Sequence, residues 1–319
     1  WSVYTTIDSQ SQTSSVASVL NELFLYDKRH GWRKPDNYGN LFSSEQQRLL
    51  ENSDISFLLD NSYFQDIDLD EDNLSNKLSK IFDSYAFYKT HIKAIVINVT
   101  NEKITFINED FDLGSIAWRE EYGWAREQIS INELGPKPSS FNQILSFGDF
   151  IYLKTNDDSY IFDQIPNIES SLISINPNSG EVIAYVGGKN FNESNFDRVR
   201  LSFPQSGSSF KPFIYSSSLA SGYNLSTLIN DAPIVFEDEN LESEWRPQNY
   251  TGEFYGPISI RDALVKSVNI VSIKLLRELG IENSHTYLNN FGFTKSRLPN
   301  DLSLALGSGN FSAAEMVRA

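Results

Sequence analysis

The sequence predicts an α+β protein that is divided into three consecutive regions. A helix and a polar, acidic connector fill the first 90 positions, and several short strands follow at close spacing over about 91–166. From 167 onward a hairpin signal precedes helical patterns, which is typical of a domain that mixes sheet and helix. The chain has 319 residues, of which 40% are hydrophobic, so it is large enough for two or three compact domains.

The first region is expected to be a linker over 1–90. Residues 4–10 predict a short strand, and apolar residues at helical spacing predict a helix over 15–26, which Gly31 and Pro35 end. Residues 36–84 are polar and acidic, with the densest patch at 66–72, and favour a loosely packed, partly helical connector. This patch and the acidic run at 237–244 lack the order of calcium ligands, so we interpret both as solvated loops.

The other two regions differ in their periodicity. Residues 94–99 and 103–107 predict two strands, and more strands are expected around Ile116, Ile144, 150–153 and Tyr160, which together favour a small β-barrel or sandwich. In the last region, residues 171–175 and 181–186 flank turn residues and predict a hairpin. Helices are then expected at 208–219, 260–279 and 285–291.

The composition excludes several classes of function. The formal net charge of −16 argues against non-specific binding to nucleic acid or to an anionic membrane face. The chain has no cysteine, and His30, His91 and His285 lack the spacing of metal ligands, so we expect no metal and no cofactor. The sequence contains no run of about 18 apolar residues, so it predicts no membrane span within this chain. Because the chain begins without methionine, we expect it to be an internal part of a longer protein.

The segment Gly207-Ser208-Ser209-Phe210-Lys211 carries the strongest chemical signal. A serine hydroxyl is a weak nucleophile near neutral pH and needs a neighbouring base. Residues three apart share a helix face, so Lys211 can reach Ser208, and burial would lower the pKa of the lysine towards that of a useful base. The start of a helix also offers a free backbone N–H to an oxyanion. Alone, Ser-x-x-Lys is more often an N-cap serine followed by an exposed lysine.

A second polar motif, Lys266-Ser267-Val268-Asn269, lies inside the predicted helix 260–279. The Ser267 hydroxyl can relay a proton, and the Asn269 amide can hold both the lysine and a substrate carbonyl. Taken alone, this motif also fits an ordinary polar patch on a helix.

Further segments, taken in order, resemble the bifunctional penicillin-binding proteins of the 1A type. They are Tyr4-Thr-Thr-Ile-Asp, Tyr26-Asp-Lys-Arg-His-Gly-Trp-Arg, Tyr185-Val-Gly-Gly, Phe196-Asp-Arg-Val, Gly207-Ser-Ser-Phe-Lys-Pro-Phe, Asp231-Ala-Pro-Ile, Trp245-Arg-Pro-Gln-Asn-Tyr, Tyr255-Gly-Pro and Leu302-Ser-Leu-Ala-Leu-Gly-Ser-Gly. The Ser-x-x-Lys motif and a Ser-Asp-Asn-type motif belong to penicillin-binding proteins and serine β-lactamases. The resemblance implies a linker at 1–90, an OB-like domain at 91–166 and the first part of a transpeptidase domain of β-lactamase-like fold at 167–319.

The resemblance also implies roles for individual residues. Ser208 would be the acylated serine and Lys211 its general base, while Ser267 and Asn269 would relay protons and orient the substrate. Lys266 is expected to be structural.

Three more residues are expected near the substrate. Gly207 allows backbone and substrate to approach each other closely. Trp245 and Tyr250 would line the groove, although packing is the simpler role for an aromatic residue beside a proline.

The activity implied by the resemblance is that of a peptidoglycan D,D-transpeptidase, which acts on stem peptides ending in D-Ala-D-Ala and is inhibited by β-lactams. The longer protein would also polymerise glycan, be anchored in the inner membrane and face the periplasm. A regulatory protein could bind the OB-like domain. The third family motif, Lys-Thr-Gly, does not occur in the sequence. Because it would supply an oxyanion donor, worth about 3 kcal/mol, we expect the chain alone to be inactive.

Two alternatives remain open. A non-catalytic β-lactam sensor or partner-binding module can use the same Ser-x-x-Lys pocket. A serine β-lactamase or D,D-carboxypeptidase would use water as the acceptor, but no glutamate after Ser267 is recognisable as the base that a β-lactamase needs.

Overall fold

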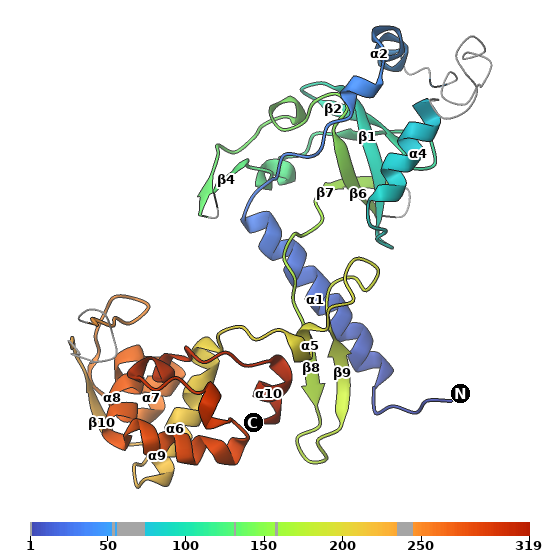
Figure 1. The fold of residues 1–319 in the computed structure, drawn as a ribbon. Helices are drawn as coiled ribbons and strands as arrows, with labels where there is room; N and C mark the ends of the chain where they lie inside the picture. The colour runs from blue at the N-terminus through green and yellow to red at the C-terminus, as the bar shows by residue number, and fades with distance from the viewer. Residues whose placement is uncertain (1, 53–54, 56–73, 131, 157–158, 235–244) are drawn as a thin grey trace. The chain divides into compact units, whose positions relative to one another are not determined.

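The computed structural model describes residues 2–52, 55, 74–130, 132–156, 159–234 and 245–319. These form two compact units, which Figure 1 shows along the chain. Unit 1 consists of Trp1–Ser15, Ser171–Gly187 and Phe196–Ala319, and unit 2 consists of Val16–Ser170 and Gly188–Asn195. Unit 1 therefore joins the first 15 residues to the last part of the chain, and the domain bounds expected from the sequence stay a prediction.

The first residues group with unit 1 because they bond to its hairpin. The Thr6 hydroxyl donates to the Val182 carbonyl at 2.6 Å, and the Asp8 N–H donates to the Ile183 carbonyl at 3.0 Å. The strand expected over 4–10 is wrong, since these residues are extended without strand pairing and helix α1 (Ser9–Arg29) already begins at Ser9.

Unit 2 is built around a five-stranded antiparallel sheet in the order β3-β2-β1-β6-β7 (Figure 1). Its strands are β1 (His91–Val99), β2 (Lys103–Asn108), β3 (Leu113–Ala117), β6 (Phe150–Asn156) and β7 (Ser159–Asp163). The central strand β1 is apolar on both faces because both are covered. Ala94 and Val96 enter one core cluster, with Phe106 and Phe162, while the alternate residues Ile95 and Ile97 enter another.

The second cluster contains helices that the sequence assigned to a loose connector. Leu50 of α2 (Ser44–Glu51) and Leu74, Leu78 and Phe82 of α4 (Leu74–Ser84) are buried against the sheet. The described parts of this stretch therefore belong to the core of unit 2, because their helices present apolar residues at a spacing of three or four. The acidic patch at 66–72 lies outside the described residues, as does the run at 237–244.

The strand expected at Ile144 is also wrong. This residue follows the 3₁₀ turn η4 (Phe141–Gln143) and packs against the cluster around Trp32. Other short elements of unit 2 are η1 (Gly39–Leu41), η3 (Glu120–Trp124) and the pair β4 (Gln128–Ser130) and β5 (Glu133–Leu134).

Unit 1 contains the predicted hairpin, β8 (Leu172–Ile175) and β9 (Val182–Val186), and the pair β10 (Leu228–Asp231) and β11 (Gly256–Ser259). Its helices include α5 (Arg198–Leu201), α6 (Lys211–Ala220), α7 (Ile260–Val265), α8 (Asn269–Leu279), α9 (Ile281–Leu288) and α10 (Ala313–Arg318), with 3₁₀ turns η5 (Gly207–Phe210), η6 (Asn289–Phe291), η7 (Lys295–Arg297) and η8 (Leu302–Leu306). Phe210, Ile214, Ile273, Leu276 and Leu288 form the centre of a core that packs α6, α8 and α9 together (Figure 1).

The prediction of a single helix over 260–279 in unit 1 is wrong. The helix expected over 260–279 is two helices, α7 and α8; the break at 266–268 contains the first three residues of the second polar motif, and its last residue, Asn269, begins α8. Within the described residues, none of the helices combines the length and apolar character that crossing a bilayer requires.

Candidate active site

Ser208 lies in the 3₁₀ turn η5, which leads directly into α6 at Lys211. The Lys211 N–H donates to the Ser208 carbonyl, so the two residues are one turn apart, and side chains three apart overlie each other in such a turn. Phe210 anchors the turn, because its buried ring stacks on Phe311 with 5.5 Å between ring centroids. The Ser208 side chain is exposed.

A second chain segment fixes the backbone just before Ser208. The Gly207 N–H donates to the Gly307 carbonyl at 2.9 Å, and the Ser206 N–H donates to the Gly309 carbonyl at 3.0 Å. A Cβ atom on Gly307 would lie 1.9 Å from the Gly207 carbonyl oxygen. Glycine is therefore required at Gly307 for the two segments to approach this closely.

The second motif adopts an unusual backbone conformation at its serine. Ser267 has a φ of 54°, in the left-handed region that residues other than glycine seldom occupy. In this conformation both its carbonyl oxygen and its hydroxyl accept from Lys211 Nζ, at 2.6 and 2.9 Å. The helix break at 266–268 is thus the feature that turns Ser267 towards Lys211.

Asn269, the first residue of α8, completes the surroundings of the lysine. Its Oδ1 accepts from Lys211 Nζ at 2.7 Å. Its Nδ2 donates to the Gln248 carbonyl at 2.9 Å, which fixes the orientation of the amide. The structure therefore brings together Lys211, Ser267 and Asn269.

Lys211 is 1% exposed, and burial lowers its pKa to about 8. Its three hydrogen-bond acceptors are all uncharged oxygens, and within the described residues none of its side-chain hydrogen bonds goes to Ser208. A charged ammonium has three N–H donors, so each of the three oxygens accepts one of them. Loss of one proton frees a lone pair, which is what a base beside Ser208 requires.

The sequence also predicts that Gly207, Trp245 and Tyr250 lie near the substrate. Tyr250 is fully exposed, and Trp245 is half-buried against the core around Phe210. Gly207 has a φ of 55° and no atom within 4 Å of the place a Cβ would take. Gly207 directly precedes Ser208 in the chain, and a substrate groove lined by Trp245 and Tyr250 stays a prediction.

Sequence reasoning missed two residues that support this site. Asn249 and Asp231 form a buried hydrogen-bonded pair, and Asn249 bonds to the start of α8. The sequence alone carries no signal for this pair. Only once the helix break is known does Val268 become an N-cap residue, and an apolar residue cannot cap a helix with its side chain. The cap then has to come from a distant polar residue.

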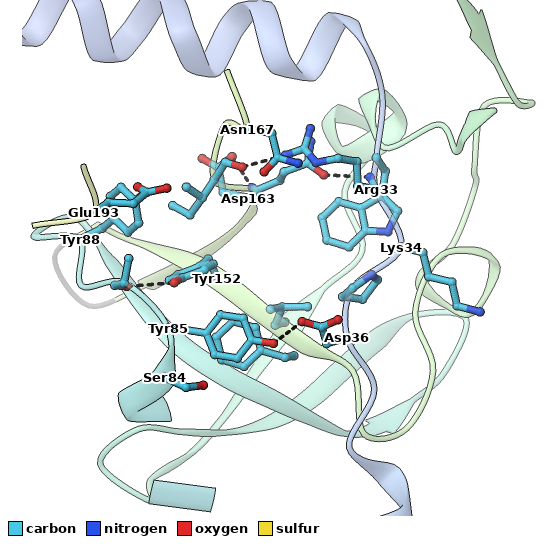
Figure 2. A pocket seen from close by; sticks show the side chains of 17 residues that line it. Arg33, Lys34, Asp36, Ser84, Tyr85, Tyr88, Tyr152, Asp163, Asn167 and Glu193 are labelled. Carbon is cyan, nitrogen blue, oxygen red and sulfur yellow. Dashed lines mark hydrogen bonds between the residues drawn. The ribbon is translucent and has the colours of Figure 1, made fainter. Parts of the chain in front are cut away.

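A separate cavity of about 570 Å³ lies in unit 2 (Figure 2). Tyr85, Tyr88 and Tyr152 line it, and the Tyr85 and Tyr88 hydroxyls donate to Asp36 and Glu193. Burial and these carboxylates raise the pKa of Tyr85 and Tyr88. Because these hydroxyls already bond to carboxylates of the protein, we interpret the tyrosines as structural residues of the cavity wall and not as catalytic groups.

Comparisons with known proteins agree with this architecture. Residues 171–308 match the family model of the penicillin-binding protein transpeptidase domain, and residues 64–168 match that of the penicillin-binding protein OB-like domain. A crystal structure of penicillin-binding protein 1A from Haemophilus influenzae superposes with a TM-score of 0.76 at 25% identity, covering 98% of this chain and 40% of that chain. The chain therefore has the penicillin-binding transpeptidase fold with an OB-like domain, and it belongs to the penicillin-binding proteins.

Within this family the chain is homologous to the class A proteins of the 1A type, which confirms the resemblance found in the sequence. It is 36% identical to penicillin-binding protein 1A of Pseudomonas aeruginosa over 100% of its own length, and 33% identical to that of Vibrio cholerae over 99%. The chain covers 35% and 36% of these two relatives, about a third of their length.

Proposed function

We propose that this chain provides the acylation site of a peptidoglycan D,D-transpeptidase, with Ser208 as nucleophile and Lys211 as general base. The observation that carries the proposal is a buried amine, one turn from an exposed serine, surrounded by the neutral oxygens of Ser267 and Asn269. An amine in such a place loses its proton more readily than a solvated lysine does. The family membership supports the same assignment.

In the proposed reaction, neutral Lys211 takes the proton of the Ser208 hydroxyl while Oγ attacks the carbonyl carbon of the penultimate D-Ala. The backbone N–H of Ser208, near the start of a helical turn, would donate to the oxyanion that forms. The resulting ammonium then returns the proton to the leaving amine of the terminal D-Ala, and Ser267 is placed to relay it. An ester links the peptide to Ser208.

The acyl-enzyme is resolved when the amine of a second stem peptide attacks the ester carbonyl. Lys211 accepts the proton of this amine and returns one to Ser208 Oγ as the ester breaks. A β-lactam enters the same first step, because its amide carbonyl accepts Oγ and its ring nitrogen leaves. The leaving group stays attached, so it hinders the acceptor amine.

Further properties of the whole protein are part of the proposal. From the resemblance to the bifunctional 1A type, we propose that the whole protein is a periplasmic enzyme anchored in the inner membrane, with a glycosyltransferase activity outside this chain. A regulatory protein at the OB-like domain remains a prediction from the resemblance.

The acylation proposal is tested by mass spectrometry of the full-length protein after exposure to a labelled penicillin. One adduct is expected, on the peptide that contains Ser208, and Ser208→Ala should abolish it. An adduct on another residue, with none on Ser208, would overturn the assignment. Release of D-Ala from a stem-peptide substrate distinguishes an enzyme from a sensor, which is acylated without turnover. Rapid hydrolysis of the penicillin adduct would instead indicate a β-lactamase.

A further inference from the structure

Helix α8 begins at Asn269 without a cap of its own. Its N-cap residue is Val268, whose side chain forms no hydrogen bond to the helix. The first backbone N–H groups of a helix have no partner within the helix, and leaving them unpaired in a buried place costs stability. The position of Asn269 therefore depends on a group from elsewhere in unit 1.

That group is the side chain of Asn249. Its Oδ1 accepts from the backbone N–H of Asn269 at 3.0 Å and from that of Ile270 at 3.3 Å. Asn249 is buried, so these bonds are shielded from water. One side chain thus caps α8 from a distant part of the sequence.

The other end of the Asn249 amide is fixed as firmly. Nδ2 donates to both carboxylate oxygens of Asp231, at 3.0 and 2.8 Å, and to the Glu253 carbonyl at 2.8 Å. Asp231 is fully buried at the end of β10, and its Oδ2 also accepts from the Tyr255 N–H at 2.9 Å. With acceptors on one side and donors on the other, the amide has a single orientation that satisfies every group.

Gln248, the residue before Asn249, holds the side chain of Asn269. The Gln248 carbonyl accepts from Asn269 Nδ2, so residues 248 and 249 fix both the backbone and the amide of Asn269. The remaining amide oxygen can then point only towards Lys211 Nζ, where it lies at 2.7 Å. A continuous path of hydrogen bonds runs from Asp231 through Asn249 and Asn269 to the lysine.

We propose that Asn249 is a positioning residue for Lys211, held by Asp231, and that it sets the place of the Asn269 amide oxygen beside the lysine. The kinetic consequence rests on the proposed acylation at Ser208, whereas the structural consequence does not. Asn249 does not touch the reacting atoms. It acts by fixing one of the three oxygens that accept hydrogen bonds from the Lys211 amine.

The test compares Asn249→Ala with Ser43→Ala in the full-length protein. Ser43 caps α2 in unit 2 through the Gln46 N–H at 3.2 Å, so its loss also removes a helix cap but touches nothing near Lys211. Misplacement of a catalytic group costs up to about 100-fold in rate. We expect Asn249→Ala to lower the maximal rate of penicillin acylation by about 10- to 100-fold with little change in the apparent dissociation constant, and Ser43→Ala to lower only the melting temperature.

Asp231→Asn provides a milder second variant should Asn249→Ala fold poorly. It keeps the size of the side chain but leaves one carbonyl oxygen for the donors of Asn249 and Tyr255, so we expect a smaller loss of the maximal rate, by a few-fold. A melting temperature that falls while both rates stay at the native value would overturn the proposal.

A crystal structure of the Asn249→Ala protein, or of Asp231→Asn, decides the proposal independently of acylation. The expected result is an intact fold in which Asn269 Oδ1 has moved away from Lys211 Nζ. Retention of the 2.7 Å contact in Asn249→Ala would overturn the positioning role. If the native protein is not acylated at all, the proposed function fails, but this structural measurement still decides the role of Asn249.

Discussion

Two buried lysines, one in each unit, show how neighbouring groups separate a structural amine from a reactive one. Lys93 on β1 is 7% exposed, and its Nζ pairs with the Glu109 carboxylate at 3.3 Å and donates to the Phe82 carbonyl at 2.7 Å. Lys211 on α6 is 1% exposed, and its three acceptors are neutral.

Burial alone therefore does not distinguish a structural lysine from a candidate catalytic one. A carboxylate beside a buried amine offsets much of the cost of removing its charge from water, whereas carbonyl, hydroxyl and amide oxygens offset less. Lys211 therefore keeps the full effect of burial, and its pKa falls to about 8. The same side chain type serves the core in one unit and is proposed to carry out acid–base chemistry in the other.

The largest expected effect is obtained by removing each amine in turn. Lys211→Met should lower the acylation rate by about 10²–10⁴-fold, the usual contribution of a general base, while the protein remains folded. Lys93→Met should leave the acylation rate of the folded protein unchanged and lower the free energy of unfolding by about 1–3 kcal/mol, because Glu109 and the Phe82 carbonyl lose a partner. Stopped-flow acylation with a fluorescent penicillin and thermal unfolding measure both. Equal acylation rates in the two variants would remove the distinction.

A loss of about 100-fold in the acylation rate is expected when the close contact between Gly307 and Gly207 is disturbed. Gly307→Ala would drive a Cβ against the Gly207 carbonyl and displace the turn that holds the nucleophile, so the acylation rate should fall by about 100-fold. Gly292→Ala is the matched control, since Gly292 also has a positive φ, of 90°, but has nothing within 4 Å of an added Cβ. Both variants should lose about 1–2 kcal/mol from backbone strain, and only Gly307→Ala should lose acylation. If Gly292→Ala also lowers the acylation rate, backbone strain, and not displacement of Ser208, causes the loss.

The smallest effect sharpens the role of the strained serine. Ser267→Gly removes the hydroxyl beside Lys211 but relieves the left-handed conformation at φ 54°. The free energy of unfolding should therefore rise by about 1 kcal/mol, while acylation falls about 10-fold. Ser267→Ala keeps the strain and should lose acylation without gaining stability. If both variants unfold at the same temperature, the conformation stores no strain.

The strand pattern of unit 2 was largely predictable from the sequence, because a strand covered on both faces is a nearly continuous apolar run. All five strands of the sheet, β1, β2, β3, β6 and β7, coincide with strands that the sequence predicts. The helices α2 and α4 were not placed in the core, since their few apolar residues stand among charged ones. What the composition could not reveal is that those few residues all face the sheet.

The residues of the candidate site also fall into two groups, those that the sequence predicts and those that only the fold shows. Ser208, Lys211, Ser267 and Asn269 are visible as motifs, because their chemistry requires particular residue types at short spacing. The helix break at Ser267 was missed, since its left-handed backbone has no glycine to announce it. Asn249 acts across a distance in sequence, and only the fold shows which N–H groups its side chain reaches.

The pH dependence of penicillin acylation reports directly on whether Lys211 acts as the base for Ser208. Only the neutral amine of Lys211 can take the serine proton, so a pKa of about 8 predicts a rate that rises about tenfold per pH unit below pH 8 and levels off above it. The measurement is the maximal acylation rate of the full-length protein between pH 5 and pH 10, at penicillin concentrations that saturate the site. A rate that is already level at pH 6, or that keeps rising to pH 10, would contradict the account of Lys211 as a base prepared by burial among neutral oxygens.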